Sequence, residues 1–360
     1  MKFSSELPLY ESLKRALLER IKNGDLPEGT RILPEIELAR TMGVSRSTAR
    51  KALQALEMDG YLSRTAGRGS FVKSRRKTMG SASAARGTFG AAFCAADRFN
   101  HVGEVLQGFT NKAVADGFRV LVHPQSAEQA DQFEYLVGVC NSDMDGWALW
   151  LAAPTEKTVG LLRHVQDAGC ALVLVDRFVR TLDTDSVVTK NEKMTFELTR
   201  ELTRRGRREV GFINFSDANT VNEDRETGYR RALADAGLDV NPDYLIRDGQ
   251  GGQEALRLQI LATLGLRRRP TGMCCASARH AAVLAEELQR LGYGIPEDVE
   301  LAVIDDERMA DRAEFPILCA RQRSYDMGSI AAELLLNRLE HPDSEWQQVR
   351  LDYDLNFPRE

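Results

Sequence analysis

From residue 87 onward, short apolar runs alternate with segments whose apolar residues recur at helical spacing. Such alternation is typical of parallel sheets covered by helices on both faces. The stretch is longer than one sheet of this kind usually needs, so we expect an α/β domain built from two lobes with a cleft between them. The expected strands are Phe89–Ala96, Phe118–His123, Gly146–Leu151, Ala171–Val175, Val187–Thr189, Val210–Phe215, Gly272–Ala276 and Glu300–Ile304. The expected helices are Val102–Asp116, Thr158–Ala168, Glu192–Arg204, Arg225–Ala236, Gly252–Leu264 and His280–Leu291.

The first 73 residues follow a different pattern, in which apolar residues at helical spacing predict three short helices. Gly43 is a helix-stop residue and Ser45 a helix cap, so the second and third helices are expected to form a helix-turn-helix pair. Two short strands around a Gly-rich turn predict a β-hairpin, the wing of a winged helix-turn-helix. These elements are expected at Pro8–Ile21, Glu35–Met42, Arg46–Met58, Tyr61–Arg64 and Ser70–Lys73.

The two patterns define the expected domain boundaries. Residues 74–86 are basic, rich in Ser and Ala and without a hydrophobic period, which predicts an exposed linker. We therefore expect a winged helix-turn-helix domain at 1–73 and the two-lobed α/β domain at 87–360. The lobes are expected roughly at 87–187 with 319–341, and at 188–318 with 342–360.

Charge is distributed unevenly along the chain. Residues 1–77 contain 16 Lys and Arg against 9 Asp and Glu, a balance of +7, whereas residues 78–360 contain 32 against 44, a balance of −12. A basic segment suits the phosphate backbone of DNA, and an acidic remainder is repelled by it. A charged face that is merely solvated is the alternative explanation of the charge alone.

The third predicted helix carries a polar face suited to DNA. Arg46 and Arg50 are neighbours at i and i+4, so their guanidinium groups project from the same side. A guanidinium group can bond O6 and N7 of guanine or a phosphate, and hydroxyl groups near a helix N-terminus add phosphate contacts. The candidate DNA-binding residues on this helix are Ser45, Arg46, Ser47, Thr48, Arg50 and Lys51.

Residues 8–73 resemble the winged helix-turn-helix of the GntR family of bacterial transcription factors. The matching segments are Gly43–Leu53, Asp59–Leu62 and Gly67–Val72. The resemblance implies that Arg46, Thr48 and Arg50 contact the major groove of DNA. It also implies that Gly67 and Arg68, at the tip of the wing, approach the minor groove. One difference is Ile36, which stands where family members commonly have an arginine that contacts DNA, so that contact is expected to be missing.

The chain from about Gly87 to its end resembles the LacI/GalR effector domain, which is itself similar to periplasmic sugar-binding proteins. A similar pairing of a GntR-type DNA-binding domain with a LacI-type effector domain occurs in arabinose-responsive repressors. The segments that carry this resemblance are Asp145–Gly146, Val173–Arg177, Arg204–Ile213, Asp224–Tyr229, Gly292–Val299 and Val303–Asp306.

This second resemblance implies a small ligand held between the lobes. The family residues that match Arg225 and Asp305 bond hydroxyl groups of the ligand, and the chemistry is reasonable because a guanidinium donates in a fixed fork while a carboxylate accepts. Asp176 follows a strand and is expected to line the cleft as well. Each of the three also has a structural alternative: Arg225 as an ion-pair partner of a neighbouring glutamate, and the two aspartates as loop caps.

The ligand itself is less constrained by the sequence. Ser277 stands where the family commonly has asparagine, and the aromatic residue that often stacks on a sugar near Asp248 is missing. Lys190 would suit a sugar acid or a sugar phosphate. Candidates for a replacement aromatic residue are Phe99, Trp147, Trp150 and Phe178. The expected effector-binding residues are Phe99, Asp176, Arg225, Ser277 and Asp305.

Other classes of protein are poorly supported. The sequence has none of the GxSxG, HExxH or GxxxxGK[ST] motifs, and its five His residues have no metal-ligand spacing, so no catalytic residue, metal or cofactor is expected. The six Cys residues form no CxxC pair, which favours reduced core thiols. No apolar stretch approaches the roughly 18 residues that a membrane span requires, and no signal peptide is recognisable, so the cytoplasm is the expected location.

The sequence therefore predicts a dimeric, ligand-responsive regulator of transcription, more specifically a repressor. Its expected partners are an operator in double-stranded DNA, a carbohydrate-type effector and a second copy of the chain, and no membrane. Two other interpretations stay open: a regulator whose effector is not a sugar or has been lost, and a solute-binding or enzymatic α/β protein with an incidental basic N-terminus.

Overall fold

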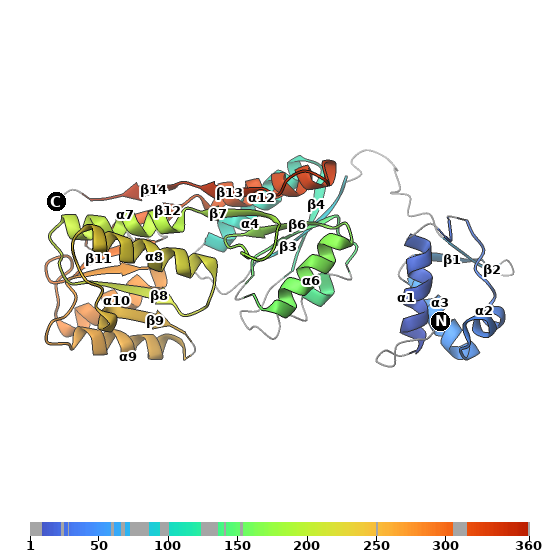
Figure 1. Cartoon of the computed structure of the whole chain (residues 1–360), viewed down its shortest axis with the longest axis horizontal. Coiled ribbons are helices and arrows are strands. Elements are labelled where there is room, and N and C mark those ends of the chain that lie inside the picture. The colour runs from blue at the N-terminus through green and yellow to red at the C-terminus, as the bar shows by residue number, and fades with distance from the viewer. Residues whose placement is uncertain are drawn as a thin grey trace. The chain divides into compact units, whose positions relative to one another are not determined.

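The computed structural model describes residues 9–22, 25–27, 29–58, 61–65, 69–72, 86–93, 101–123, 136–139, 142–151, 154–249, 251–304 and 315–358. The chain divides into two compact units, Met1–Ala84 and Ala85–Glu360. Each unit has its own hydrophobic core. Figure 1 labels most of the helices and strands of both.

The first unit is a winged helix-turn-helix, with three helices and an antiparallel hairpin close to their predicted positions. The apolar face of α3 supplies Ala49, Ala52 and Leu56, which are fully buried against Leu13 and Leu17 of α1. Gly43 ends α2 in the left-handed conformation with φ 67°, as a helix-stop glycine does. The elements are α1 (Leu9–Lys22), α2 (Glu35–Met42), α3 (Arg46–Met58), β1 (Leu62–Thr65) and β2 (Gly69–Val72).

The first lobe of the second unit is built on a six-stranded sheet in which every neighbouring pair is parallel. Apolar side chains on one face pack with α4 and α12, and those on the other pack with α6. The strand order is β13-β7-β6-β5-β3-β4. The elements of the lobe are β3 (Gly87–Ala92), α4 (His101–Ala115), β4 (Phe118–Val122), β5 (Gly146–Leu149), α6 (Glu156–Asp167), β6 (Ala171–Val175), β7 (Asp185–Thr189), α12 (Ser324–Glu340) and β13 (Gln348–Leu351).

The second lobe has a six-stranded sheet of the same kind, with β14 as its one antiparallel strand. One face packs with α7 and α8, and the other with α9 and α10. The strand order is β14-β12-β11-β10-β8-β9. The elements are α7 (Asn191–Arg204), β8 (Val210–Phe215), α8 (Thr220–Asp235), a 3-10 turn (Pro242–Tyr244), β9 (Leu245–Asp248), α9 (Gly252–Leu264), β10 (Gly272–Cys275), α10 (Ala278–Leu291), β11 (Glu300–Ile304), β12 (Leu318–Gln322) and β14 (Tyr353–Asn356).

The expected fold class, an α/β protein with an N-terminal winged helix-turn-helix, is therefore confirmed. The chain crosses between the lobes three times, at Lys190, Arg323 and Asp352, each time in a single residue between two elements. Two strands differ from the predicted lobe assignment: β12 pairs in the second sheet, and β13 pairs in the first. The apolar pattern of a strand shows that it is buried but not which of two sheets it joins, so the crossings could not be located from sequence.

Four strands, β9, β12, β13 and β14, were not among those predicted. Three of them, β9, β13 and β14, are edge strands. Of these, β13 and β14 expose much of their length, so they lack the continuous apolar run of a central strand. None of the helices in the described part of the chain combines the length and the hydropathy that crossing a bilayer requires.

Candidate DNA-binding and effector-binding sites

The predicted DNA-binding residues form the outer face of α3. Ser45 caps the helix, because its Oγ accepts a hydrogen bond from the Thr48 amide at 3.1 Å. Its hydroxyl group also lies 2.8 Å from that of Ser47 and 2.7 Å from that of Thr48. The side chains of Ser45, Arg46, Ser47, Arg50 and Lys51 are exposed, and Thr48 is half-buried.

Both arginines of this face share one carboxylate. The Nε of Arg50 donates to Oε2 of Glu35 at 3.1 Å, and the Nε of Arg46 lies 3.6 Å from the same oxygen. Glu35 is the first residue of α2, so the ion pairs join the two helices of the helix-turn-helix. Ile36 beside it is 62% exposed. Gly67 and Arg68 lie outside the described residues.

Asp176 follows β6 at the carboxyl edge of the first sheet, the edge at which parallel α/β proteins bind ligands. Among the described residues other than glycine, it alone has a positive φ, 68°, a conformation that costs about 1 kcal/mol or more and is concentrated at functional sites. Its carboxylate is buried and lies 3.3 Å from the Arg177 guanidinium and 3.6 Å from Nε2 of His101.

The surroundings of Asp176 favour its ionised form. Burial alone would raise the pKa of this carboxyl, but the interaction with His101 and the positive charge of Arg177 outweigh it. The charge of Arg225, from the second lobe, acts in the same direction. The pKa of Asp176 therefore lies below its ordinary value, and the group is an acceptor of hydrogen bonds near neutral pH.

Arg225 lies on α8 in the second lobe and is 5% exposed. Its Nε donates to Oδ1 of Asn191 at 3.0 Å, and its Nη1 donates to the carbonyl of Ala276 at 2.9 Å. Asn191 directly follows the crossing at Lys190, and Ala276 directly follows β10. The guanidinium therefore connects a crossing between the lobes with the carboxyl edge of the second sheet.

Ser277 follows Ala276 and caps α10, since its Oγ accepts from the His280 amide at 3.3 Å. Its hydroxyl is half-buried at the same edge as Arg225. Asp305 and Phe99, the other two predicted effector-binding residues, lie outside the described residues.

Two clusters at these strand ends were not found by sequence reasoning. In the first lobe, His101 begins α4 and places its Nδ1 2.6 Å from Oγ of Ser324, the residue after the second crossing. In the second lobe, Asp248 at the end of β9 pairs with Arg279 and lies 3.1 Å from Nε2 of His280. One signal for the second cluster was present in the sequence. Asp248 lies in the segment where the resembling family often has an aromatic residue that stacks on a sugar.

His280 is fully buried, and its ring packs at a tilt against Phe215, with the ring centroids 4.5 Å apart. Burial and the positive charges of Arg279 and Arg225 lower the pKa of this imidazole to about 3. His280 is therefore neutral at physiological pH and acts as a hydrogen-bonding partner of Asp248 without charge.

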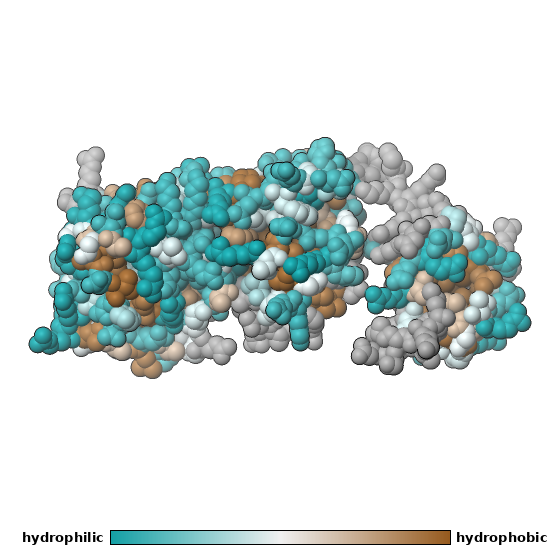
Figure 2. Space-filling view, in the orientation of Figure 1, coloured by the Kyte–Doolittle hydropathy of each residue, from teal (hydrophilic) through white to brown (hydrophobic). Residues whose placement is uncertain are grey.

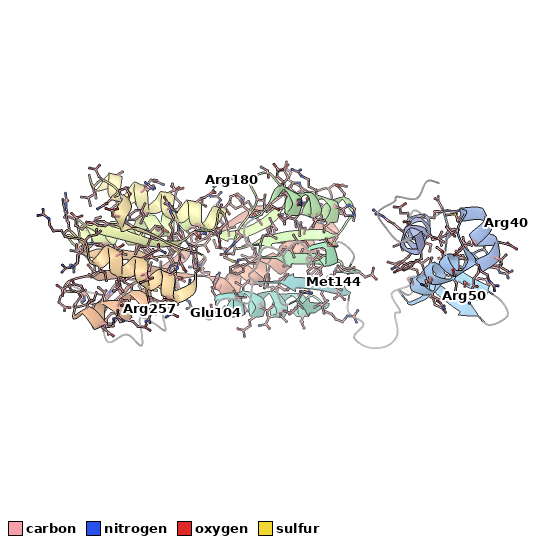
Figure 3. All side chains as sticks on the ribbon, turned by 90° about the horizontal axis from the view of Figure 1, so that it is seen from below. Arg40, Arg50, Glu104, Met144, Arg180 and Arg257 are labelled. Carbon is pink, nitrogen blue, oxygen red and sulfur yellow. The ribbon has the colours of Figure 1, made fainter. Side chains whose placement is uncertain are left out.

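The candidate aromatic residues have different surroundings. Trp150 lies at the end of β5, packed edge-on against His101 at 5.2 Å and under the Arg177 guanidinium at 5.5 Å. Trp147, by contrast, belongs to the core between the first sheet and α6. Phe178 is half-buried, with the Arg180 guanidinium 5.4 Å from its ring centroid. The same guanidinium lies 3.3 Å from Glu223 and 3.4 Å from Asp224 of α8. Arg180 is labelled in Figure 3.

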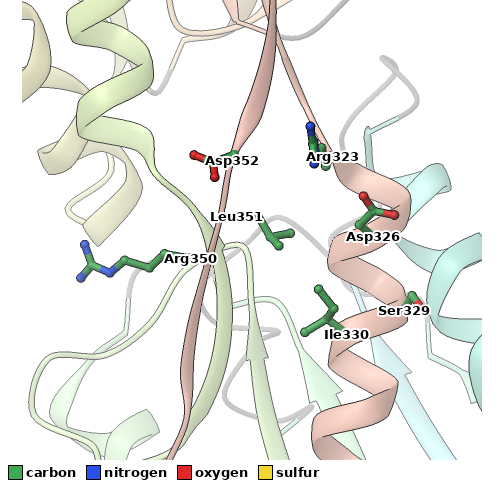
Figure 4. Close-up of a pocket in the computed structure, with 7 residues that line it drawn as sticks. All are labelled: Arg323, Asp326, Ser329, Ile330, Arg350, Leu351 and Asp352. Atoms are coloured by element: carbon green, nitrogen blue, oxygen red, sulfur yellow. The ribbon is translucent and has the colours of Figure 1, made fainter.

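A pocket of about 370 Å³ lies where α12 passes β13. In Figure 4, Leu351 points toward Ile330 on the helix, while Arg350 points away on the other side of the strand. The predicted anion-binding residue Lys190 does not line this pocket, and its Nζ pairs with Asp352 at 2.7 Å. The pocket contains none of Asp176, Arg225 and Ser277, so it is separate from the strand-end groups.

Residues 9–72 match the gntR family of bacterial regulatory proteins, and residues 199–356 match the periplasmic binding protein-like domain. The arabinose metabolism transcriptional repressor of Geobacillus stearothermophilus is 25% identical over 340 residues, which are 93% of this chain and 92% of that protein.

Two solved structures share the fold. A complex of a transcriptional regulator with cellobiose has a TM-score of 0.67 at 18% identity, covering 90% of this chain and 98% of that chain. A LacI family regulator from Enterococcus faecium with bound ribose has a TM-score of 0.63 at 19% identity, covering 75% of this chain and 96% of that chain. The expectation that the chain is a regulator of transcription and not an enzyme agrees with these families. The chain therefore joins an N-terminal region that matches the gntR family of bacterial regulatory proteins to a region that matches the periplasmic binding protein-like domain.

Proposed function

We propose that this chain is a transcription repressor that reads an operator with α3 and responds to a sugar or sugar derivative bound between the lobes. The observation that carries the proposal is the presence, in one chain, of an exposed basic helix in a winged helix-turn-helix and of polar groups at the carboxyl edges of two parallel sheets. Ser45, Arg46, Ser47, Thr48, Arg50 and Lys51, with Gly67 and Arg68 of the wing, are the proposed DNA-binding residues.

Binding to DNA is tested by fluorescence anisotropy with duplexes selected by the chain from a randomised pool. Replacing Arg46 or Arg50 by alanine should weaken binding by about 1 to 3 kcal/mol each, because each loses a guanidinium contact. Binding should also weaken steeply with salt, because phosphate contacts release counterions. Arg230→Ala, an exposed arginine of α8, is the matched control. Unchanged affinity in the Arg46/Arg50 double variant would refute the assignment of α3.

The effector-binding residues that we propose are Phe99, Asp176, Arg225, Ser277 and Asp305. An ionised carboxylate on one lobe and a guanidinium on the other are acceptor and donor for the hydroxyl groups of a sugar. A sugar ligand is supported by the similarity to a repressor of arabinose metabolism and to two regulators whose structures contain cellobiose or ribose. Closing the lobes on such a ligand would shift the protein between two conformations with different affinity for the operator.

A thermal-shift panel of arabinose, ribose, cellobiose, sugar acids and sugar phosphates tests the ligand class. A ligand present at 100 times its Kd stabilises the protein by about 2.7 kcal/mol and should raise the Tm by about 5 °C. A response only to phosphates or acids would favour an anionic effector. A chain that binds DNA selectively but responds to no member of the panel would instead have an effector of another class or none.

We also propose that the chain acts in the cytoplasm as a homodimer, so that two DNA-binding domains meet the two halves of a pseudo-palindromic operator. Large apolar side chains are exposed on both lobes, among them Leu121 and Val122 of β4 and Leu258 of α9. Figure 2 likewise has hydrophobic patches on both lobes in an otherwise hydrophilic face. Sedimentation velocity should give twice the mass of the chain, and Leu258→Lys should reduce it toward that of the monomer.

A further inference from the structure

Glu35 occupies a particular place among the charges of the DNA-binding unit. Its side chain is 13% exposed, while those of Arg46 and Arg50 are 60% and 51% exposed. Both Nε and Nη2 of Arg50 lie 3.1 Å from Oε2 of Glu35. The carboxylate therefore sits at the foot of the arginine pair, beneath the face that α3 presents to solvent.

The side of the guanidinium that Glu35 contacts matters for recognition. A planar guanidinium has five N–H groups. One N–H of Nη2 lies beside that of Nε, and the other lies beside an N–H of Nη1, so the group has two different edges that can each donate a pair of hydrogen bonds. Because Glu35 holds the first edge of Arg50, the second points away from the carboxylate. Two parallel N–H groups on that end are what a bidentate contact with O6 and N7 of guanine requires.

A free arginine side chain has many rotamers, and ordering it on DNA costs free energy. An ion pair that fixes the orientation beforehand reduces this cost for the one geometry it favours. The negative charge acts in addition on every DNA sequence, since it offsets part of the attraction between the arginines and the phosphates. The first effect increases the difference in affinity between the correct sequence and any other, and the second lowers the affinity for every sequence.

We propose that Glu35 is a positioning residue for DNA recognition, which holds Arg50 in the orientation that reads guanine and lowers sequence-independent binding. This inference rests on the proposed DNA-binding function. Glu35 lies on α2, the helix before the proposed recognition helix α3, and is not itself expected to contact a base.

The full chain is tested with three probes: a duplex that the wild type recovers from a randomised pool, its single-base variants, and a scrambled duplex of the same composition. Glu35→Gln should reduce the affinity ratio of selected to scrambled duplex by about tenfold, the loss expected for one misplaced bidentate contact. Relaxed discrimination should be confined to the base pair that Arg50→Ala also relaxes. Glu37→Gln removes the same charge from an exposed position of α2 and should leave the ratio within about twofold.

A double-mutant cycle separates positioning from general stability. In an Arg50→Ala background, Glu35→Gln should cause no further loss of discrimination, because its effect passes through Arg50. If Glu35→Gln unfolds at a lower temperature than the wild type, Glu35→Asp is used in its place. This variant keeps the charge but withdraws the carboxylate by one methylene, and it should lose the same discrimination between base pairs. The inference is overturned if Glu35→Gln behaves as Glu37→Gln does, if discrimination falls equally at all positions, or if the effect persists without Arg50. If the wild type recovers no duplex at all, the proposed function fails, and this inference with it.

Discussion

At the scale of single residues, the buried polar groups of the effector domain have two roles at once. Arg225 supports the fold, because Asn191 and the carbonyl of Ala276 accept its hydrogen bonds, and it is also the proposed donor to the effector. Removing one partner of a buried hydrogen bond leaves the other unsatisfied, which costs more than the bond itself is worth. Substitutions here are therefore expected to alter stability and response together.

Arg225→Ala should lower the free energy of unfolding by about 1 to 3 kcal/mol and weaken effector binding at least tenfold, since buried charge-assisted bonds are worth about 1.5 to 3 kcal/mol. Urea unfolding and a titration with the sugar identified by thermal shift measure the two effects. Arg230→Ala, on the exposed face of the same helix, should leave both unchanged. An unchanged binding midpoint in folded Arg225→Ala would make this residue structural only.

His280 makes the stability of the effector domain depend on pH. Its pKa is about 3 in the folded protein, below the ordinary value near 6.5 of an unfolded chain, so the unfolded state takes up a proton first as the pH falls. Its contribution to stability is complete above pH 6.5 and is lost toward pH 3, at up to about 1.4 kcal/mol per pH unit. The free energies of unfolding measured with urea at pH 7 and at pH 5 should differ less in His280→Gln than in the wild type. His164→Gln, exposed on α6, should keep the wild-type difference.

At the scale of elements, α4 and α12 of the first lobe are in close contact. Gly108 on α4 and Gly328 on α12 let the two backbones meet, because a Cβ at Gly328 would overlap the carbonyl of Val105, and one at Gly108 would overlap that of Tyr325. Since α12 begins directly after the second crossing, this contact also ties the crossing to the first lobe.

Gly328→Ala should therefore destabilise the protein by about 3 kcal/mol, the upper part of the range for an overpacked core, because rigid backbone must move. Gly160→Ala is the opposite case. Gly160 lies on the exposed side of α6 with open space around it, so alanine should add about 0.5 to 1 kcal/mol of stability. Thermal melts of the two variants should shift in opposite directions, and equal shifts would contradict this account of the α4 and α12 contact.

At the scale of the whole molecule, residues 74–86 join the DNA-binding domain to the α/β domain. The sequence of 74–86 predicts a flexible, exposed tether, and we expect the effector to act through the dimer arrangement of the effector domains. Inserting a few Gly-Ser residues near Ser81 should then reduce the effect of the ligand on operator affinity only gradually, because chain dimensions grow roughly as the square root of length. Complete loss of regulation from a two-residue insertion, with both domains folded and dimeric, would mean that the segment is a structured lever.

The sequence alone determined the parts of this protein that depend on local pattern. The three helices and the hairpin of the first unit, the stop at Gly43, and the central strands and their helices follow from spacing, caps and apolar runs that neighbours in sequence supply. The exposed face of α3 follows for the same reason, since residues four apart share one side of a helix.

Only the tertiary structure decided the features that join distant segments. It assigned β12 and β13 to their sheets, placed the crossings, and brought His101 to Asp176, Asp248 to His280, and Glu35 to the arginines of α3. Helical and strand periodicity reports whether a side chain faces the interior, but it carries no information about which segment lies opposite. The pairings of buried charged groups depend on packing between elements that are far apart in the chain. For that reason only the tertiary structure could give them.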